Sequence, residues 1–286
     1  MPGEFIGYDS EIDKINNAIT KSGSDSNINI ALIAEPYAGK TTLIDFIYER
    51  FHEISKKITI SPHQNDFKSL GSVLEDDIQR IVFIDDCHML YRRKVGGFEA
   101  LGSFLSMVAT NPDYMFITSW NIHSWNYLNE VLQIEKYFPC RICLPEFEVE
   151  DLRSVLMSQH VTDKVVFESE KKNDIGHFFE TGKYSFHINK LDRSLSIPYF
   201  KLNYGLLKEK LRRNKEEATL EELAFMKIKD ISSGNISLSK IIWEKSLHNS
   251  IIKVDEIYSP SFDAKMDYDT KFLAFMLLSM GHMSIK

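Results

Sequence analysis

Residues 34–42 contain the residue types that bind phosphate groups and a divalent cation. They match the phosphate-binding pattern G-x-x-x-x-G-K-[ST], except that alanine stands at the first position. In such a loop the backbone N–H groups bind phosphate oxygens, the lysine reaches the β- and γ-phosphates, and the next hydroxyl ligates Mg²⁺. We predict that the nucleotide-binding residues are Ala34, Glu35, Pro36, Tyr37, Ala38, Gly39, Lys40, Thr41 and Thr42.

Two details of this segment decide how the pattern is interpreted. Thr41 is the predicted metal ligand, and Ala34 would add strain of about 1 kcal/mol if its position required a positive φ. Residues 28–33 (INIALI) form a short apolar, β-branched run, and apolar residues recur at helical spacing over residues 43–51. This strand–loop–helix context favours a true phosphate-binding loop (P-loop) over the alternative, a plain glycine turn before a helix.

A second motif, residues 80–88 (RIVFIDDCH), is a short apolar run that ends in two carboxylates. At the carboxyl edge of a parallel strand, Asp85 would hold the hydration shell of Mg²⁺, and Asp86 would orient or deprotonate an attacking water. This segment therefore resembles a Walker B strand; an ordinary solvated strand end is the alternative. His88 follows the strand; we interpret it as a hydrogen-bonding residue of the loop, and a contact with nucleotide or a neighbouring subunit is the alternative.

The composition predicts a folded chain with a sizeable core. It has 286 residues, 43% of them hydrophobic, and a formal charge of −7 from 34 basic and 41 acidic residues. That charge gives no overall electrostatic footprint for nucleic acid. We therefore interpret the aromatic cluster Trp120, His123, Trp125 and Tyr127 as core packing and not as a base-stacking surface. Three cysteines provide no disulfide framework, which fits a reduced cytoplasmic compartment.

Periodicity predicts an α/β domain followed by a helical region. Strand signals occur at residues 28–34, 57–60, 80–85, 114–119 and 141–144, with helix signals at 11–20, 98–109 and 125–135. This alternation is typical of a parallel sheet with helices on both faces. After residue 145 the helix signals lie at 148–159, 218–231, 235–249 and 267–280, and residues 160–215 have mixed polarity that suggests an insertion.

The order of these motifs resembles that of AAA+ ATPases, and within them the STAND and origin-recognition-like groups that carry a helical lid. Four further segments are similar to family motifs over roughly residues 4–250. Residues 5–11 (FIGYDSE) resemble the N-terminal box near adenine, and residues 115–121 (MFITSWN) look like the sensor 1 strand. Residues 142–152 resemble the start of the lid, and residues 231–237 (ISSGNIS) the start of its last helix.

The resemblance implies that the cofactors are ATP and Mg²⁺. It places Ile6 near adenine and gives Thr118 or Ser119 a contact with the γ-phosphate or the attacking water. Three family positions differ in this chain. Tyr8 replaces an arginine, Asp86 replaces a glutamate, and Ser237 lies where the sensor 2 arginine would fall, so that cation is absent or moved to Lys240.

The resemblance also implies three regions. These are a P-loop nucleotide-binding domain at residues 1–144, a helical lid at 145–255 with an insertion around 160–215, and a C-terminal helix at 256–286. We favour this helix as the start of a winged-helix domain, and a short helical tail is the alternative. A cation from a neighbouring subunit often stabilises the transferred phosphoryl group. Arg141 lies near the family position of this arginine finger, and Arg92 and Arg93 are further candidates.

Our leading hypothesis is an ATP-binding and ATP-hydrolysing AAA+/STAND-type switch that self-associates or acts on a protein partner. One alternative is a DNA-associated loader or transposition-regulator ATPase that reads DNA through a C-terminal domain. Another is an adaptor that binds ATP with little turnover. The sequence has no apolar run long enough to span a bilayer, and the apolar stretch at residues 272–280 is too short.

Overall fold

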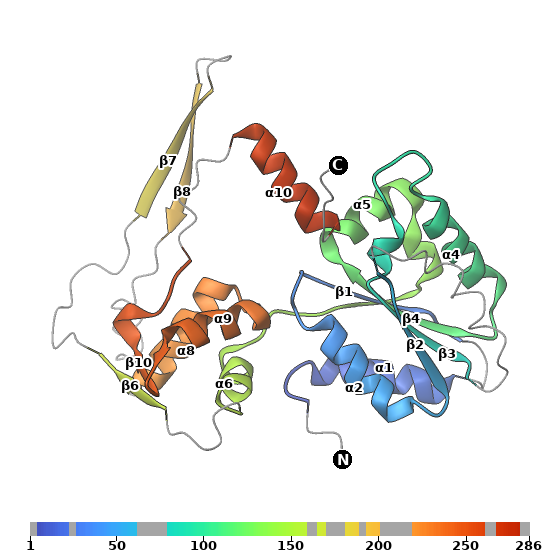
Figure 1. Cartoon of the computed structure of the whole chain (residues 1–286), viewed down its shortest axis with the longest axis horizontal. Coiled ribbons are helices and arrows are strands. Elements are labelled where there is room, and N and C mark those ends of the chain that lie inside the picture. Colours follow the sequence, from blue (N-terminus) through green and yellow to red (C-terminus); the bar gives the residue numbers. More distant parts are fainter. Residues whose placement is uncertain are drawn as a thin grey trace. The chain divides into compact units, whose positions relative to one another are not determined.

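The computed structural model contains a five-stranded parallel sheet with helices packed around it (Figure 1). The structure describes residues 5–22, 27–61, 79–158, 165–169, 181–188, 193–200, 219–260 and 267–280. The chain divides into two compact units. Unit 1 comprises Met1–Phe147, Asn235–Leu238 and Ser261–Lys286, and unit 2 comprises Glu148–Gly234 and Ser239–Pro260.

The sheet of unit 1 contains β1 (Ile30–Ala34), β2 (Ser55–Thr59), β3 (Ile81–Asp85), β4 (Met115–Asn121) and β5 (Cys140–Cys143). Its strand order is β2-β3-β4-β1-β5, and every pairing is parallel. All residues of β1, β3 and β4 are buried, which explains their nearly continuous apolar sequences. Because β4 lies between β1 and β3, the carboxyl ends of these three strands meet at one edge of the sheet.

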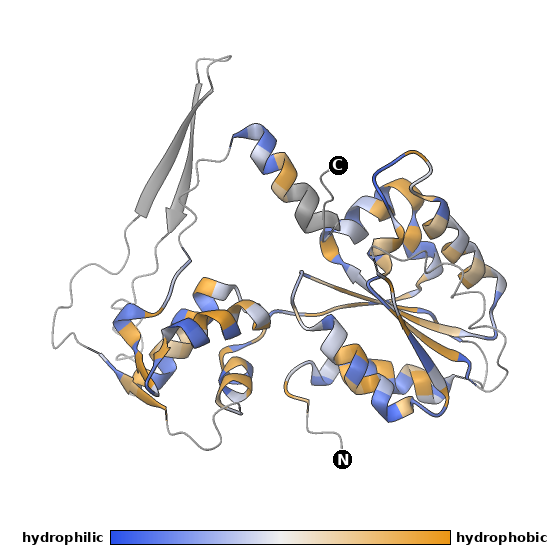
Figure 2. Cartoon of the chain, in the orientation of Figure 1, coloured by the Kyte–Doolittle hydropathy of each residue, from blue (hydrophilic) through white to orange (hydrophobic). Residues whose placement is uncertain are grey.

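Helices cover both faces of this sheet. Figure 1 shows α1 (Asp9–Lys21) and α2 (Lys40–Phe51) on one face, and α4 (Glu99–Thr110) and α5 (Ile122–Leu132) on the other. Alternate strand residues such as Ala31, Val82 and Trp120 pack with α4 and α5 in one hydrophobic cluster. The apolar residues, orange in Figure 2, accordingly concentrate along the central strands. The predicted α/β class, a parallel sheet with flanking helices, is confirmed.

Unit 2 combines helices with short strands. Its helices are α6 (Val149–Ser158), α8 (Leu220–Ser232) and most of α9 (Ile236–Ser246), whose first residues belong to unit 1. A capping box of Thr219 and Glu222 begins α8. In the core of unit 2, the rings of Phe225 and Trp243 stack with their centroids 5.3 Å apart.

Strands also occur in unit 2, where we predicted helices and an insertion. They are β6 (Val166–Glu168), β9 (Leu247–His248) and β10 (Ile251–Lys253) in one small sheet, and β7 (Thr181–Ile188) paired antiparallel with β8 (Arg193–Phe200). The helix predicted at 235–249 was therefore too long, because α9 ends at Ser246 and β9 follows. Strands of two or three residues carry too little periodicity to be recognised in a sequence. The rest of the predicted insertion lies outside the described residues.

The C-terminal helix signal corresponds to α10 (Tyr268–Met280). The winged-helix domain that we expected it to start stays a prediction, and residues 281–286 lie outside the described part of the chain. In the described residues we find no helix with both the length and the apolar character needed to cross a bilayer.

A tight turn follows the short 3₁₀ helix η1 (Cys87–Leu90) in unit 1. Arg92 N donates to Gly97 O at 3.0 Å, and Gly97 N donates to Lys94 O at 2.9 Å. A β-carbon added at Gly97 would lie 1.6 Å from Arg92 O, so the backbone leaves no space for any side chain. The turn therefore requires glycine at this position.

We expect Gly97→Ala to lower the free energy of unfolding by about 1–3 kcal/mol or more, because the backbone must shift to admit the methyl group. The matched control is Gly102→Ala in α4, where an added β-carbon meets nothing within 4 Å. That control should be neutral or stabilising by about 0.5–1 kcal/mol, since alanine favours a helix interior. Urea unfolding of both variants measures the difference; equal stabilities would contradict the steric argument.

Candidate functional site

The loop between β1 and α2 has the backbone shape of a P-loop without strain at its first residue. Ala34 is the last residue of β1 and has no positive φ, so the strain considered for alanine does not arise. The left-handed conformations fall instead on Tyr37 (φ 62°) and Gly39 (φ 88°). Glycine adopts such values freely, whereas Tyr37 does so at a cost of about 1 kcal/mol.

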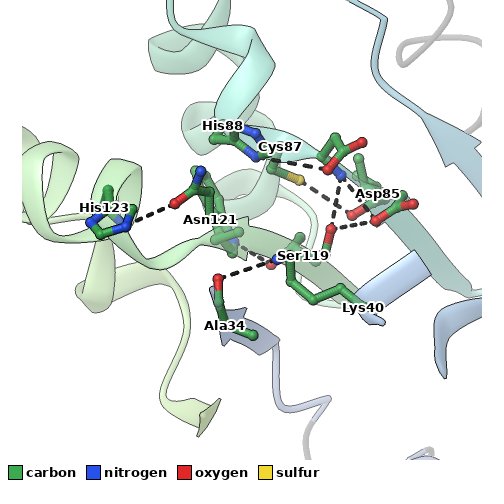
Figure 3. A network of polar contacts seen from close by, with 12 residues as sticks. Ala34, Lys40, Asp85, Cys87, His88, Ser119, Asn121 and His123 are labelled. Atoms are coloured by element: carbon green, nitrogen blue, oxygen red, sulfur yellow. Dashed lines mark hydrogen bonds and ion pairs between the residues drawn. The ribbon is translucent and has the colours of Figure 1, made fainter. Parts of the chain in front are cut away.

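Lys40 is the first residue of α2, and its side chain turns back into the loop (Figure 3). Its Nζ donates to Glu35 O at 2.7 Å and to Ala34 O at 3.2 Å. The residue is only 7% exposed, and burial lowers the pKa of its ammonium group, opposed by the carboxylates of Asp86, Asp85 and Glu35. An ammonium has three N–H donors, and among the described residues these two carbonyls are its acceptors. The third donor is available to a ligand.

A serine on β4 binds both aspartates at the end of β3, one through its carboxylate and the other through its backbone N–H. Ser119 Oγ donates a short hydrogen bond to Asp85 Oδ1 and accepts one from Asp86 N at 2.8 Å. Asp85 is fully buried, and its Oδ2 has no hydrogen-bond partner in the described structure. A buried carboxylate oxygen without a partner is costly unless a ligand satisfies it. This oxygen fits a Mg²⁺ ion or one of its water ligands.

Asp86 begins η1 in a left-handed conformation, with φ 57°. Burial, and then the neighbouring Asp85, raise the pKa of its carboxyl to about 6, while Lys40 and Lys57 act in the opposite direction. A group with this pKa exchanges protons near neutral pH, which suits a general base.

His88 is the second residue of η1, two positions after Asp86, and belongs to the same site. It is 6% exposed, its Nδ1 lacks a hydrogen-bond partner in the described structure, and that atom lies 3.9 Å from Asp86 Oδ1. Burial, with a smaller effect of Lys40, lowers the pKa of His88 to about 4, so the imidazole is neutral at pH 7. Our sequence analysis favoured a loop residue over a nucleotide contact for His88; its spacing of three residues from Asp85 is the signal that places it near the carboxylates.

The segment Asn235–Leu238 contributes to this site within unit 1. Asn235 Nδ2 donates to Pro36 O at 2.9 Å, and Ser237 Oγ donates to Tyr37 O at 2.7 Å. Both acceptors are carbonyls of the P-loop. The start of α9 therefore binds the backbone of the loop directly, and Ser237, at the predicted sensor 2 position, contacts the loop through a hydroxyl.

The N-terminal box packs on the other side of the P-loop. Tyr8, which replaces the arginine of the family pattern, donates from its hydroxyl to Ala38 O at 2.8 Å and packs edge-on against Phe147 at 4.7 Å. Gly7 is required there, because an added β-carbon would lie 2.6 Å from the Phe147 ring. Ile6 is partly buried beside this contact. Its predicted contact with adenine stays a prediction.

A cavity of about 610 Å³ opens above these groups. Such a volume is in the range of small-molecule and cofactor sites. Its walls come from the P-loop, from the segments after β3 and β4, and from the start of α9: Pro36, Tyr37, Gly39, Lys40, Thr41, Thr42, Asp86, His88, Met89, Asn121 and Ser237.

Two residues of the predicted catalytic set lie away from this cavity. Thr118 is fully buried; its hydroxyl donates to Ile30 O at 3.0 Å and accepts from Trp120 Nε1 at 2.8 Å. Of the two sensor 1 candidates, only Ser119 touches the carboxylates. Arg141 lies on β5 and pairs with Glu135 at 2.7 Å, and its role towards a neighbouring subunit stays a prediction.

The aromatic residues near the end of β4 divide between core and surface. Trp120 and Trp125 are buried and meet edge-on at 5.5 Å, as core packing predicts. Tyr127 is an exposed residue, and His123 Nε2 instead lies 3.1 Å from Glu35 Oε2 of the P-loop. The interpretation as core packing was therefore wrong for these two residues.

The sheet, the P-loop and the paired aspartates define unit 1 as an α/β domain with the P-loop NTPase fold. No protein-family model matches the sequence, and no curated protein matches it. Several solved structures are similar to it.

The RuvB Holliday junction branch migration motor of Thermotoga maritima is 16% identical, with a TM-score of 0.47, and the match covers 85% of this chain and 62% of RuvB. Hsp104 in a closed state with ATPγS and casein is 21% identical (TM-score 0.42; 53% of this chain, 29% of Hsp104). ORC2 of Aeropyrum pernix is 14% identical (TM-score 0.42; 56% and 52%).

All three are AAA+ P-loop ATPases, the class that the order of motifs resembles. The chain spans less than two thirds of the length of each. These low identities and TM-scores say nothing of substrate or activity.

The raised pKa of Asp86 predicts a pH-dependent difference in stability between wild type and Asp86→Asn. Because the folded-state pKa of about 6 exceeds the unfolded value of 3.8, Asp86 stabilises the fold fully below pH 3.8 and loses that contribution as pH rises through 6. Without nucleotide or Mg²⁺, the melting temperature of Asp86→Asn should therefore rise relative to wild type between pH 4 and pH 7. A constant difference would contradict the raised pKa.

Proposed function

We propose that this protein binds ATP with Mg²⁺ and hydrolyses it, and that the nucleotide state acts as a switch of the AAA+/STAND type. The observation that supports this most directly is a buried cation and a carboxylate in the wall of one cavity, beside a second, fully buried carboxylate. Lys40 provides the cation and Asp86 the carboxylate in the cavity wall, and Asp85 is the buried neighbour whose charge acts on both. Adenine as the base is inferred from the family resemblance.

The phosphates would occupy the positively polarised side of the cavity. The backbone N–H groups at the start of α2 lack helical acceptors and carry the positive end of the helix dipole. Lys40 now donates to two loop carbonyls, and phosphate oxygens would compete for the same donors. Thr42, beside Thr41, lines the same wall.

For the metal, the fit rests on the unpartnered Oδ2 of Asp85 and the exposed hydroxyl of Thr41. The described residues contain no group of three or more His, Cys, Asp or Glu that could hold a metal ion alone. Phosphate oxygens would therefore complete the coordination, as is usual for Mg²⁺. When bound, Mg²⁺ neutralises charge on the phosphates.

Asp86 is proposed as the residue that orients and deprotonates the attacking water. Its pKa of about 6 suits that role, and its backbone is fixed by Ser119. The Ser119 hydroxyl thus holds the carboxylate of Asp85 and the backbone of Asp86. Asn235 and Ser237 bind carbonyls of the P-loop. A change in the conformation of the loop on nucleotide binding would therefore move the start of α9.

An ATP-binding adaptor with little turnover is the second candidate function. Asp86 is one methylene shorter than the usual glutamate, and Ser237 offers no positive charge to a developing phosphoryl anion. The DNA-associated alternative depends on a domain after residue 256, and self-association with Arg141 as the arginine finger depends on a second subunit. Both stay proposals.

The first experiment measures Mg-ATP affinity and turnover of the wild type, Lys40→Ala and Asp86→Asn over a range of protein concentrations. We expect Lys40→Ala to weaken ATP binding at least tenfold, because it removes the cation that meets the phosphates. Asp86→Asn should retain binding and lose turnover by about 10²–10⁴-fold, the usual contribution of a general base.

Turnover that rises with protein concentration would support assembly. Binding by the wild type without turnover at any concentration would favour the adaptor, and wild-type protein that binds no ATP would refute the proposed function.

Ser237→Arg distinguishes a slow enzyme from an adaptor. Ser237 lines the cavity, so an arginine there would bring a guanidinium towards the phosphates. In an enzyme limited by the missing cation, turnover should rise about tenfold or more. Ser237→Ala, which removes the hydroxyl without adding charge, is the matched control. Unchanged turnover in Ser237→Arg, with ATP still bound, would show that the missing cation does not limit the rate.

A further inference from the structure

His88 is a buried polar residue whose environment is incomplete. In the described part of the chain, four buried side-chain atoms lack a hydrogen-bond partner, and two of them, Asp85 Oδ2 and His88 Nδ1, belong to the same site. Burying a polar nitrogen without a partner is unfavourable, so packing alone would favour an apolar residue of similar size. The nitrogen is therefore available to a ligand that enters the cavity.

The geometry specifies where such a ligand would lie. His88 Nδ1 and Asp86 Oδ1 are 3.9 Å apart, too far for a direct hydrogen bond. An oxygen atom at a normal hydrogen-bond distance of about 2.8 Å from each fits between or beside them, because the separation is less than twice that distance. Both residues line the cavity. The distance therefore allows one water molecule to contact the carboxylate and the imidazole together, after a small shift of the side chains that exposes the buried Nδ1 to the cavity.

The surroundings let the imidazole perform this task. Its pKa of about 4 keeps it neutral at pH 7, so it adds no positive charge that would pair with Asp86. A neutral ring can donate or accept through Nδ1, according to its tautomer. The 3₁₀ helix η1 fixes the distance between the two side chains, because Asp86 is its N-cap and His88 is its second residue.

We propose that His88 is a positioning residue for hydrolysis, which holds the attacking water against Asp86 through its Nδ1. This inference rests on the proposed function. In the reaction the water oxygen forms a bond to the γ-phosphorus, and the bond from that phosphorus to the bridging oxygen breaks, with its electron pair leaving on ADP. One proton of the water passes to the Asp86 carboxylate, and the products are ADP and inorganic phosphate.

Three substitutions separate this role from packing. His88→Asn keeps a polar atom bonded to Cγ, as Nδ1 is. His88→Gln moves the polar atoms one bond further out, towards the place of Nε2. His88→Leu keeps a similar volume without a polar atom. The chain of residues 1–286 is used, at a concentration where wild-type turnover has reached its plateau.

We expect the substitutions that remove or displace the polar atom to lower turnover and to leave ATP binding nearly unchanged. His88→Leu and His88→Gln should lower kcat about tenfold to a hundredfold while the KM and Kd for Mg-ATP change less than twofold. His88→Asn should stay within about threefold of the wild type. The melting temperature of His88→Leu should be unchanged or higher, since it removes an unsatisfied buried atom. A structural role would instead lower stability and leave kcat per folded molecule unchanged.

The outcomes distinguish this inference from the proposed function. If all three variants hydrolyse ATP at the wild-type rate, the role of His88 is refuted and the ATPase proposal stands. If His88→Asn lowers kcat as much as His88→Leu does, the shape of the ring matters and not a polar atom at the position of Nδ1. That result also refutes the proposed role of His88. A wild type that binds ATP without turnover would overturn both hydrolysis and this role, and one that binds no ATP would overturn the proposed function itself.

Discussion

The position of β4 between β1 and β3 is the constraint on which the site depends. β1 leads into the P-loop and β3 ends at the first of the two aspartates. The polar carboxyl-terminal residues of β4 therefore lie between the carboxyl ends of these two strands. Ser119 then bonds Asp85 and Asp86 from that strand. Side chains of a strand alternate between faces, so Trp120 packs with α4 and α5 while Ser119 turns towards the site. A shift of one residue in the register of β4 would exchange these two residues.

The electrostatic balance of the site follows from that arrangement. Lys40 is buried with two loop carbonyls as acceptors, and three carboxylates act on it from a distance. Burial disfavours the charged form of both Lys40 and Asp86, so neither group is at its most stable in the ligand-free fold. The site is thus prepared for partners that only a bound ligand supplies, which is how functional sites hold perturbed pKa values. The rest of the sheet stabilises this arrangement through buried apolar strands.

The sequence predicted the parallel α/β class and the order of the sheet's elements well, because β1, β3 and β4 are apolar runs with polar residues at their ends. It also predicted a loop between a strand and a helix at residues 34–42, because the spacing of that motif is local; the binding of nucleotide by these residues stays a prediction. It could not separate Thr118 from Ser119, since both belong to one strand and only the register decides which faces the site. The contact of Asn235 with Pro36 joins residues 199 positions apart and has no local signal. The strands β6, β9 and β10 were missed because pairing between distant short segments, and not local periodicity, forms them.

The distribution of indole rings gives each unit its own spectroscopic signature. The chain has three tryptophans. Trp120 and Trp125 lie in unit 1, where Trp120 separates the two site residues Ser119 and Asn121, and Trp243 lies in unit 2 beside Phe225. All three are buried, so their emission shifts when the surrounding core is exposed to water. Replacing Trp243 with phenylalanine leaves fluorescence that reports on the sheet domain alone, so the cooperativity of the two units can be followed without an added label.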